Sequence, residues 1–338
     1  MHRQHIHCTT QIEELKALDP SLVPLQGFRF RIFVIPISGS RDNDKVWALP
    51  RCPGASLLAH SHAYICTEYE RFNMPLRIAI LTCDTPVPEA NRRYNGYGGM
   101  FTSLLESSAT ASGLDPRDLE ITVFDIVDGS HYPKLEDIDA ILMTGSSAYW
   151  LRDLCTCANT ATEYNSYDDT PWILRLLEYT KKVLAQDRVR ILGICFGHQI
   201  LGRALGTKVG RSDQGWEVSV CDMDLTEKGK EVFGRDKILC SSRIQQMHQD
   251  IVFSVPPNMI SLGSSPRCEV QGMYAARRFI TVQGHPEYNE AIVKEIVNIR
   301  TRAGVFKAEF AQDALDRAGK DHDGLGIATV FLKFLLEE

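Results

Sequence analysis

Residues 191–199 read ILGICFGHQ, and this stretch says most about the fold. An apolar run of strand length passes into a Gly-x-Cys-x-Gly pattern around Cys195, and an apolar helical pattern follows at once. Strand, tight turn and helix in this order are typical of a nucleophile elbow, here with cysteine as the nucleophile. The flanking glycines avoid side-chain clashes in a strained turn, and the start of the helix stabilises a thiolate. A buried structural cysteine is the alternative interpretation.

A candidate base lies far downstream, where residues 283–288 read QGHPEY. The short apolar run before this segment predicts a strand, so His285 and Glu287 follow a strand end. Pro286 favours an extended or turn conformation at His285 and suits the start of a helix. Parallel-sheet enzymes place active sites at strand ends, and Glu287 is near enough in sequence to orient the imidazole. Taken alone, His285 is also compatible with an ordinary loop histidine.

Strand and helix patterns alternate from residue 74 onward. Apolar runs predict strands at residues 76–82, 121–126, 140–143 and 190–194, with helical patterns at residues 100–108 and 171–186. This alternation predicts an α/β fold with a mostly parallel central sheet flanked by helices on both faces. Further strand candidates and three closing helices follow residue 217, so we expect one domain over residues 74–338.

The composition is that of a globular protein, with 44% hydrophobic and 24% charged residues among 338 and a net charge of −6. This negative charge is unsuited to neutralising phosphates, so we expect no nucleic-acid partner. No apolar stretch is long enough for a membrane helix, and no signal peptide is recognisable, so we expect no membrane partner. Ten cysteines are few for a disulfide scaffold of this length and favour reduced thiols in the cytoplasm.

No motif predicts a metal or a cofactor. His60 and His62, like Cys155 and Cys157, form close pairs without a second pair at zinc-site spacing. The glycine-rich residues 96–99 do not directly follow a strand and do not satisfy the dinucleotide fingerprint. We therefore expect neither a metal ion nor a cofactor.

Cys195, His285 and Glu287 together resemble the class I, triad-type glutamine amidotransferases, in which a Gly-x-Cys-x-Gly elbow is paired with a downstream His-Pro-Glu. The resemblance covers residues 75–300 approximately and implies a flavodoxin-like α/β fold. Within the family, the chain is most similar to the stand-alone, glutamine-amidotransferase-like proteins of fungi and plants. The segments consistent with this branch are residues 144–146, 215–217 and 247–250.

The resemblance implies cleavage of a side-chain amide. The Cys195 thiolate would attack glutamine or a γ-glutamyl compound and form a thioester, which water then hydrolyses. His285, oriented by Glu287, would protonate the departing amine and then activate that water. His248 and Asp250 form a His-x-Asp pair that competes for the base role, and we expect it to line the pocket instead.

The same resemblance implies the groups that hold the substrate. Backbone N–H groups of Phe196 and of the Gly145-Ser146 turn would stabilise the developing oxyanion. Gln199, one helical turn after the nucleophile, matches a position that contacts bound glutamine in the family.

Three functions remain open at this point. The first is a stand-alone hydrolase of glutamine or γ-glutamyl amides, including γ-glutamyl peptides such as glutathione conjugates. The second is a glutaminase that passes ammonia to a separate synthase partner. The third is a catalytically impaired binding or regulatory homologue.

Two segments depart from the family pattern. Residues 1–73 precede the first predicted strand of the domain, and we expect them to be an N-terminal extension that is poorly structured or an artefact of the gene model. Residues 148–164 are an insertion after the oxyanion turn and have the same possible origin. A genuine extension and a genuine lid loop are the alternatives.

Overall fold

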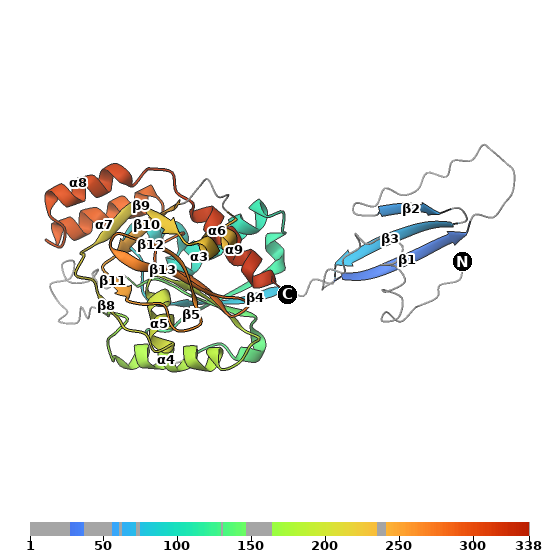
Figure 1. Ribbon diagram of the computed structural model, residues 1–338, viewed down its shortest axis with the longest axis horizontal. Helices are drawn as coiled ribbons and strands as arrows, with labels where there is room; N and C mark the ends of the chain where they lie inside the picture. The colour runs from blue at the N-terminus through green and yellow to red at the C-terminus, as the bar shows by residue number, and fades with distance from the viewer. Residues whose placement is uncertain are drawn as a thin grey trace. The chain divides into compact units, whose positions relative to one another are not determined.

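The computed structural model describes residues 75–129, 131–146, 164–234 and 241–337, together with three strands nearer the N-terminus (Figure 1). The chain divides into two compact units, Met1–Met74 and Pro75–Glu338. Nearly all of the expected insertion, residues 148–163, lies outside the described residues.

The first unit contains a small antiparallel sheet in the order β1-β3-β2. Its strands are β1 (Phe28–Pro36), β2 (Ser56–His60) and β3 (Ala63–Arg71). No strand is predicted from the sequence at residues 56–71, because they show no sustained alternation of apolar and polar residues.

The second unit is built on a nine-stranded mixed sheet in the order β10-β9-β12-β13-β14-β7-β6-β4-β5. Its parallel half contains β5 (Leu119–Asp125), β4 (Leu76–Thr82), β6 (Ala140–Met143), β7 (Arg190–Ile194) and β14 (Phe279–Val282). Its antiparallel half contains β13 (Cys268–Ala275), β12 (Ile260–Ser265), β9 (Glu217–Leu225) and β10 (Ser241–His248). The predicted α/β fold with mostly parallel core strands is confirmed.

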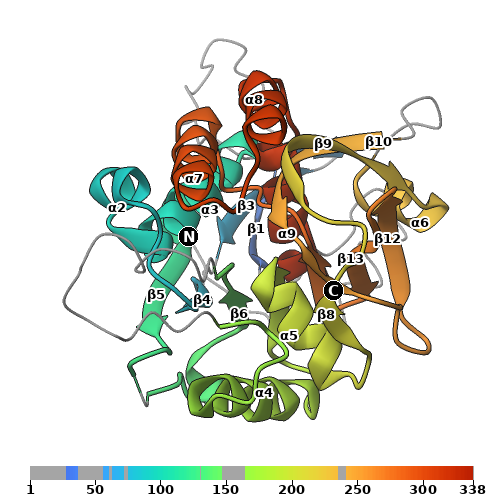
Figure 2. The same cartoon turned by 90° about the vertical axis from the view of Figure 1, so that its left-hand side faces the viewer.

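Helices cover both faces of this sheet (Figure 2). On one face, α4 (Pro171–Leu184) and α5 (Phe196–Ala204) pack against the sheet through Trp172, Ile173 and Ile200. The other face is covered by α3 (Gly96–Ala111), α7 (Glu290–Arg302), α8 (Ala308–Arg317) and α9 (Gly324–Leu336). The shorter elements are α2 (Pro88–Tyr94), α6 (Glu227–Val232), and the two-stranded sheet of β8 (Val209–Arg211) and β11 (Asp250–Val252).

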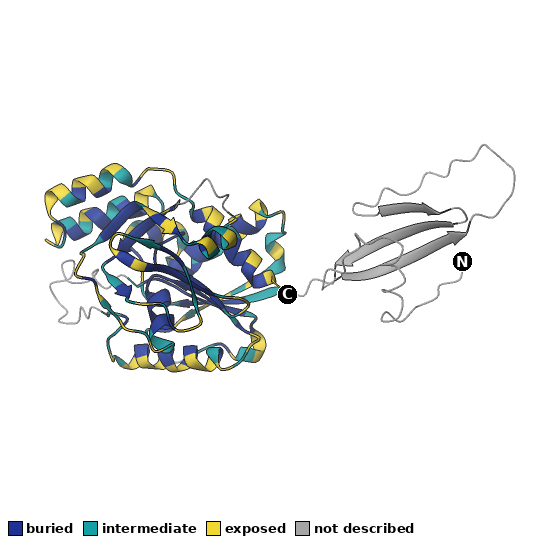
Figure 3. Cartoon of the chain, in the orientation of Figure 1, coloured by how far each residue is buried: buried dark blue, intermediate teal, exposed yellow. Residues whose placement is uncertain are grey.

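The central parallel strands are buried on both faces, which is why they read as unbroken apolar runs. Every residue of β6 and of β14 is buried, and the middle of β4 is fully enclosed. In Figure 3 the buried colour follows the strands, while the helices expose their outer sides. Among the described residues, no helix is both long and apolar enough to span a membrane.

The carboxyl ends of the parallel strands meet along one edge of the sheet. Met143 of β6 pairs with Gly193, and Val282 of β14 pairs with Ile194. The N–H of Cys195 donates to the carbonyl oxygen of Val282 at 2.9 Å, so the register continues one residue past β7. Segments far apart in the sequence are therefore fixed side by side at the edge where α/β proteins bind ligands.

Candidate active site

Cys195 is the residue between β7 and α5, and its backbone has φ 50° and ψ −100°. Positive φ is costly for a residue with a side chain and is found where surrounding structure enforces it. The enforcement comes from close packing of α5 on the neighbouring strand end. A Cβ atom on Gly197 would lie 2.4 Å from the carbonyl oxygen of Met143, so glycine is required there. The elbow predicted from the sequence is present.

His285 follows β14 and is held in place from two sides. Its backbone N–H donates to the carbonyl oxygen of Gln245 at 2.7 Å. Its Nδ1 lies 2.7 Å from Oε1 of Glu287, and both side chains are almost completely buried. This contact places a proton on Nδ1 of the ring, and the Cys195 sulfur is the other group that acts on the imidazole.

The surroundings of His285 favour its charged form. Burial by itself would lower the pKa, but the Glu287 carboxylate and the Cys195 sulfur beside the ring raise the pKa of His285 to about 10. These two neighbours therefore favour the doubly protonated imidazole. Reactive cysteines lie in electropositive surroundings of this kind, and the thiolate is the form of cysteine that acts as a nucleophile.

Tyr288 supports the imidazole from one face, a contact that sequence reasoning missed. The two rings are stacked, with centroids 4.0 Å apart and an angle of 5° between their planes. The Tyr288 hydroxyl lies 3.0 Å from the hydroxyl of Tyr97 on α3, and burial raises its pKa well above the usual value. In the sequence, only its position directly after His-Pro-Glu points to a role at the site. An aromatic residue at this position is equally typical of a hydrophobic core.

The residues predicted to hold the oxyanion lie in or beside the pocket that Cys195 lines. Ser146 and Phe196 line the same pocket as Cys195, and Gly145 contacts the imidazole of His285. Phe196 is the first residue of α5, a position whose N–H has no acceptor within the helix. The Phe196 ring is stacked on Trp172 with centroids 5.5 Å apart, which fixes the start of the helix. The oxyanion role of these backbone N–H groups stays a prediction.

Polar side chains from β10, from the two-stranded sheet of β8 and β11, and from α7 complete the pocket. His248, Gln249 and Asp250 line one wall. Arg211 donates through Nε to Oδ1 of Asp250 at 3.1 Å, which closes this wall with an ion pair. Arg300 of α7 also lines the pocket and lies over the ring of Trp216 at 4.6 Å. His248 thus belongs to the wall, as expected, while His285 holds the place next to the sulfur.

Gln199 lines the pocket, and its amide group makes hydrogen bonds to two other residues of the protein. Nε2 donates to the carbonyl oxygen of Asp250 at 2.8 Å and to Oε1 of Gln283 at 3.1 Å. Nε2 of Gln283 in turn donates to Sγ of Cys195 at 3.5 Å. Gln283 was not singled out from the sequence, because its amide gains meaning only when β7 and β14 are neighbours.

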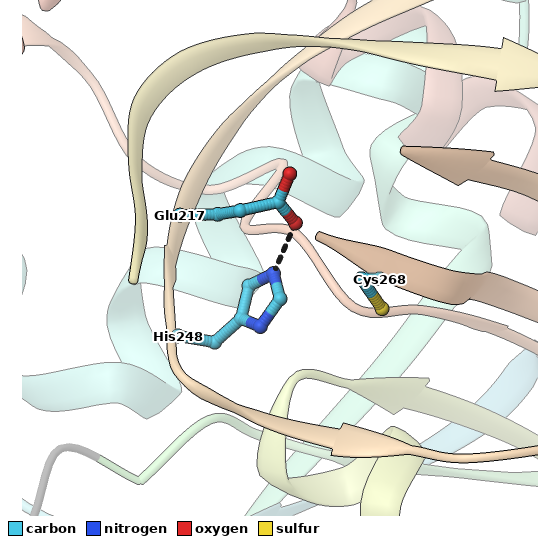
Figure 4. Close-up of side chains that lie close together, drawn as sticks. All are labelled: Glu217, His248 and Cys268. Atoms are coloured by element: carbon cyan, nitrogen blue, oxygen red, sulfur yellow. Dashed lines mark ion pairs between the residues drawn. The ribbon is translucent and has the colours of Figure 1, made fainter. Parts of the chain in front are cut away.

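Glu217, His248 and Cys268 gather next to the pocket wall, with their ligand-type atoms within 4.8 Å of one another (Figure 4). Nε2 of His248 lies 3.0 Å from Oε2 of Glu217, and this contact helps to lower the Glu217 pKa against the opposing effect of burial. Two ligands of a tetrahedral zinc ion would lie about 3.4 Å apart, so the pair has the spacing of an ion pair. Burial raises the pKa of the Cys268 thiol and favours its protonated form. The His and Cys pairs noted in the sequence lie outside the described side chains.

The fold and this site define an α/β protein with a strained cysteine elbow beside a buried His–Glu pair. The family model for class I glutamine amidotransferases matches residues 171–296. A glutamine amidotransferase-like protein of Schizosaccharomyces pombe is 35% identical over 268 residues, covering 78% of this chain and 100% of that one. The chain belongs to the class I glutamine amidotransferase family.

Two further comparisons agree with this assignment. Gamma-glutamyl peptidase 4 of Arabidopsis thaliana is 32% identical over 241 residues, covering 69% of this chain and 84% of that protein. A solved glutamine amidotransferase from Thermotoga maritima has the same fold, with a TM-score of 0.54, 18% identity, and coverage of 78% of this chain and 99% of that one. The relatives therefore include proteins named for hydrolysis of γ-glutamyl bonds.

Proposed function

We propose that this chain is a hydrolase that cleaves the side-chain amide of glutamine or a γ-glutamyl compound through a thioester. Cys195 is the nucleophile, His285 the acid and base, and Glu287 the group that orients His285. One observation carries the proposal: a cysteine on a strained elbow beside a buried imidazole whose Nδ1 lies 2.7 Å from a carboxylate.

The reaction follows from these positions. The Cys195 thiolate attacks the amide carbonyl carbon, a C–S bond forms, and the N–H groups of Phe196 and the Gly145-Ser146 turn hold the oxyanion. Collapse breaks the C–N bond, while imidazolium His285 gives its proton to the departing nitrogen. Water then adds to the thioester carbonyl and passes a proton to His285. The C–S bond breaks, releasing the carboxylic acid and restoring the thiolate.

A γ-glutamyl peptide is the more specific candidate substrate. The relatives named gamma-glutamyl peptidases support it, and they are similar to this chain over most of their length. The pocket that contains Cys195 is also lined by Arg211 and Arg300, so its wall carries positive charge of the kind that suits the carboxylates of a peptide. The reaction needs a reduced thiol, and Cys195 is free, which supports a cytoplasmic location.

A substrate panel tests the proposal. Ammonia release from glutamine and amine release from γ-glutamyl dipeptides are measured with the parent, Cys195→Ala, and Cys221→Ala as a control at another free cysteine. We expect both amides to be cleaved, dipeptides faster, with Cys195→Ala inactive and Cys221→Ala unchanged. Turnover of glutamine alone would instead favour a glutaminase that supplies ammonia to a synthase partner. Parent protein no more active than Cys195→Ala would refute the hydrolase and leave a binding or regulatory homologue.

A further inference from the structure

A chain of hydrogen bonds of fixed direction runs from the pocket wall to the sulfur of Cys195. It begins at the backbone carbonyl oxygen of Asp250, which can only accept. Gln199 lies 2.8 Å from this oxygen and must present its NH₂ group, Nε2, to it. An amide orientation inferred from hydrogen bonding is normally ambiguous, but a carbonyl partner removes the ambiguity.

The orientation of Gln199 determines that of Gln283. The second contact of the Gln199 NH₂ group is with Gln283 at 3.1 Å, so the Gln283 atom there must be the acceptor Oε1. The NH₂ group of Gln283 then faces the other way, and its Nε2 lies 3.5 Å from Sγ of Cys195. The backbone N–H of Gln283 donates to the carbonyl oxygen of Gln271 at 2.9 Å, which anchors the residue beyond the end of β14.

Because the two amides are buried, their orientation affects how well a thiolate at Cys195 is stabilised. Gln283 is fully buried and Gln199 is 4% exposed, so water does not readily replace either amide. A donor aimed at sulfur stabilises the thiolate more than the thiol, because hydrogen bonds to charged acceptors are the stronger ones. The reversed amide would place the lone pairs of Oε1 against the thiolate and oppose its formation.

We propose that Gln283 is a further catalytic residue, which donates an N–H to the Cys195 thiolate, and that Gln199 is a positioning residue that holds the Gln283 amide in the donating orientation. The sulfur then has donors on two sides, His285 and Gln283. This inference rests on the proposed role of Cys195 as the nucleophile. It also gives Gln199 a second role besides the substrate contact predicted for it.

Alkylation of Cys195 by iodoacetamide, followed against pH by mass spectrometry of its peptide, measures the thiolate without any substrate. Gln283→Met keeps the length of the side chain and removes the donor, while Gln283→Glu places a carboxylate beside the sulfur. We expect the acid-side midpoint of alkylation to rise by about one pH unit in Gln283→Met, a tenfold weaker preference for thiolate. The rise should be larger in Gln283→Glu.

Gln199 variants separate positioning from contact with the sulfur. The carboxylate introduced by Gln199→Glu could not donate to Gln283, so the Gln283 amide is expected to reverse and the alkylation midpoint to rise. Gln199→Met removes the constraint without reversing the amide, and a smaller rise is expected. Gln246→Met is the matched control, because Gln246 is equally buried but its NH₂ group donates to Gln271 instead.

The outcomes are distinct. Alkylation midpoints that stay at the parent value in both Gln283 variants overturn the donor role. A shift in Gln246→Met equal to that in Gln283→Met would also overturn it, because the loss of any buried amide would then have the same effect. A shift in Gln283 variants without one in Gln199→Glu overturns the positioning role alone. The alkylation assay contains no amide substrate. The expected alkylation shifts without hydrolysis in the substrate panel would therefore refute the proposed function and the catalytic role of Gln283, and would keep only Gln283 as the donor to the sulfur and Gln199 as the residue that positions it.

Discussion

Gly145 lies directly against the imidazole of His285, since a Cβ atom built on this glycine would fall 2.6 Å from Cε1 of the ring. The turn after β6 and the loop after β14 are therefore packed without room for a methyl group between them. The groups proposed to hold the oxyanion and to move the proton are mechanically linked, so a change in one displaces the other.

We predict that Gly145→Ala lowers amide hydrolysis by about 100-fold, because a misplacement of reacting groups by about 1 Å is enough for such a loss. The fold should persist, since the change is confined to a strand-end turn. Steady-state kinetics and thermal unfolding check both statements. Gly326→Ala is the matched control, because that glycine of α9 has nothing within 4 Å of an added Cβ. Parent-like kinetics in Gly145→Ala would contradict the linkage.

Glu287→Gln should change the pH dependence as well as the rate. The amide oxygen can still accept from Nδ1 of His285, but the negative charge that helps to raise the His285 pKa to about 10 is gone. His285 would then lose its proton at lower pH, so the alkaline limb of the pH–rate profile should move toward neutrality. A profile of kcat/KM over pH 6–11 measures the shift for the coupled Cys195–His285 pair. An unmoved alkaline limb would show that Glu287 does not set this ionisation.

We predict that the buried His198 makes the folded protein less stable in acid. Its ring is fully buried, Nδ1 lies 2.8 Å from the Thr281 hydroxyl, and burial lowers its pKa to about 3. The unfolded chain takes up this proton near pH 6.5, so the stabilisation is complete above that pH and is lost as the pH falls toward 3. From pH 7 to 4.5 the contribution should fall by about 2–3 kcal/mol.

Urea unfolding at these two pH values compares the parent with His198→Asn, which cannot titrate. The variant is expected to be less stable at pH 7 and to lose less stability than the parent on acidification. His285, whose pKa is raised, changes its contribution mainly above pH 6.5, and this change at the upper end of the window is the same in both proteins. Equal losses in the two proteins would exclude His198 as the source.

Residues 1–73 are predicted to be dispensable. Both clusters of buried side chains that make the described core lie within Pro75–Glu338, and so do the candidate site residues. A chain starting at Pro75 should therefore show the unfolding transition and the hydrolysis rate of the full chain. Tryptic mapping of the native protein would show separately whether residues 1–73 and 148–164 are made at all. Aggregation or inactivity of the shortened chain would assign the N-terminal segment a structural role.

Sequence patterns predicted those features of the structure that a few consecutive residues determine. Gly-x-Cys-x-Gly after an apolar strand marked the elbow at Cys195, since a tight turn limits the residues next to it. The buried parallel strands were recognisable from their unbroken apolar runs. Pro286 marked the strand end that carries His285. These features depend on a few consecutive residues.

Contacts made across the sheet could not be predicted from the sequence. The amide of Gln283 becomes a neighbour of the sulfur only through the pairing of β14 with β7, which no local pattern specifies. The stacking of Tyr288 on His285 and the bond from the His285 N–H to Gln245 likewise depend on how distant segments are aligned. The sequence around such residues is ordinary for a protein core, so their neighbours become known only from the tertiary structure.

Because β14 pairs with β7, the candidate site is complete only when both strands have been synthesised. Cys195 and Gln283 are 88 positions apart along the chain, so a growing polypeptide carries the thiol long before the residues that would activate it. Until the late strand joins the sheet, the cysteine lacks its imidazole and amide neighbours. The proposed amide cleavage would therefore begin only after that strand has been made, and an unfinished chain would carry the sulfur without its proposed activating neighbours.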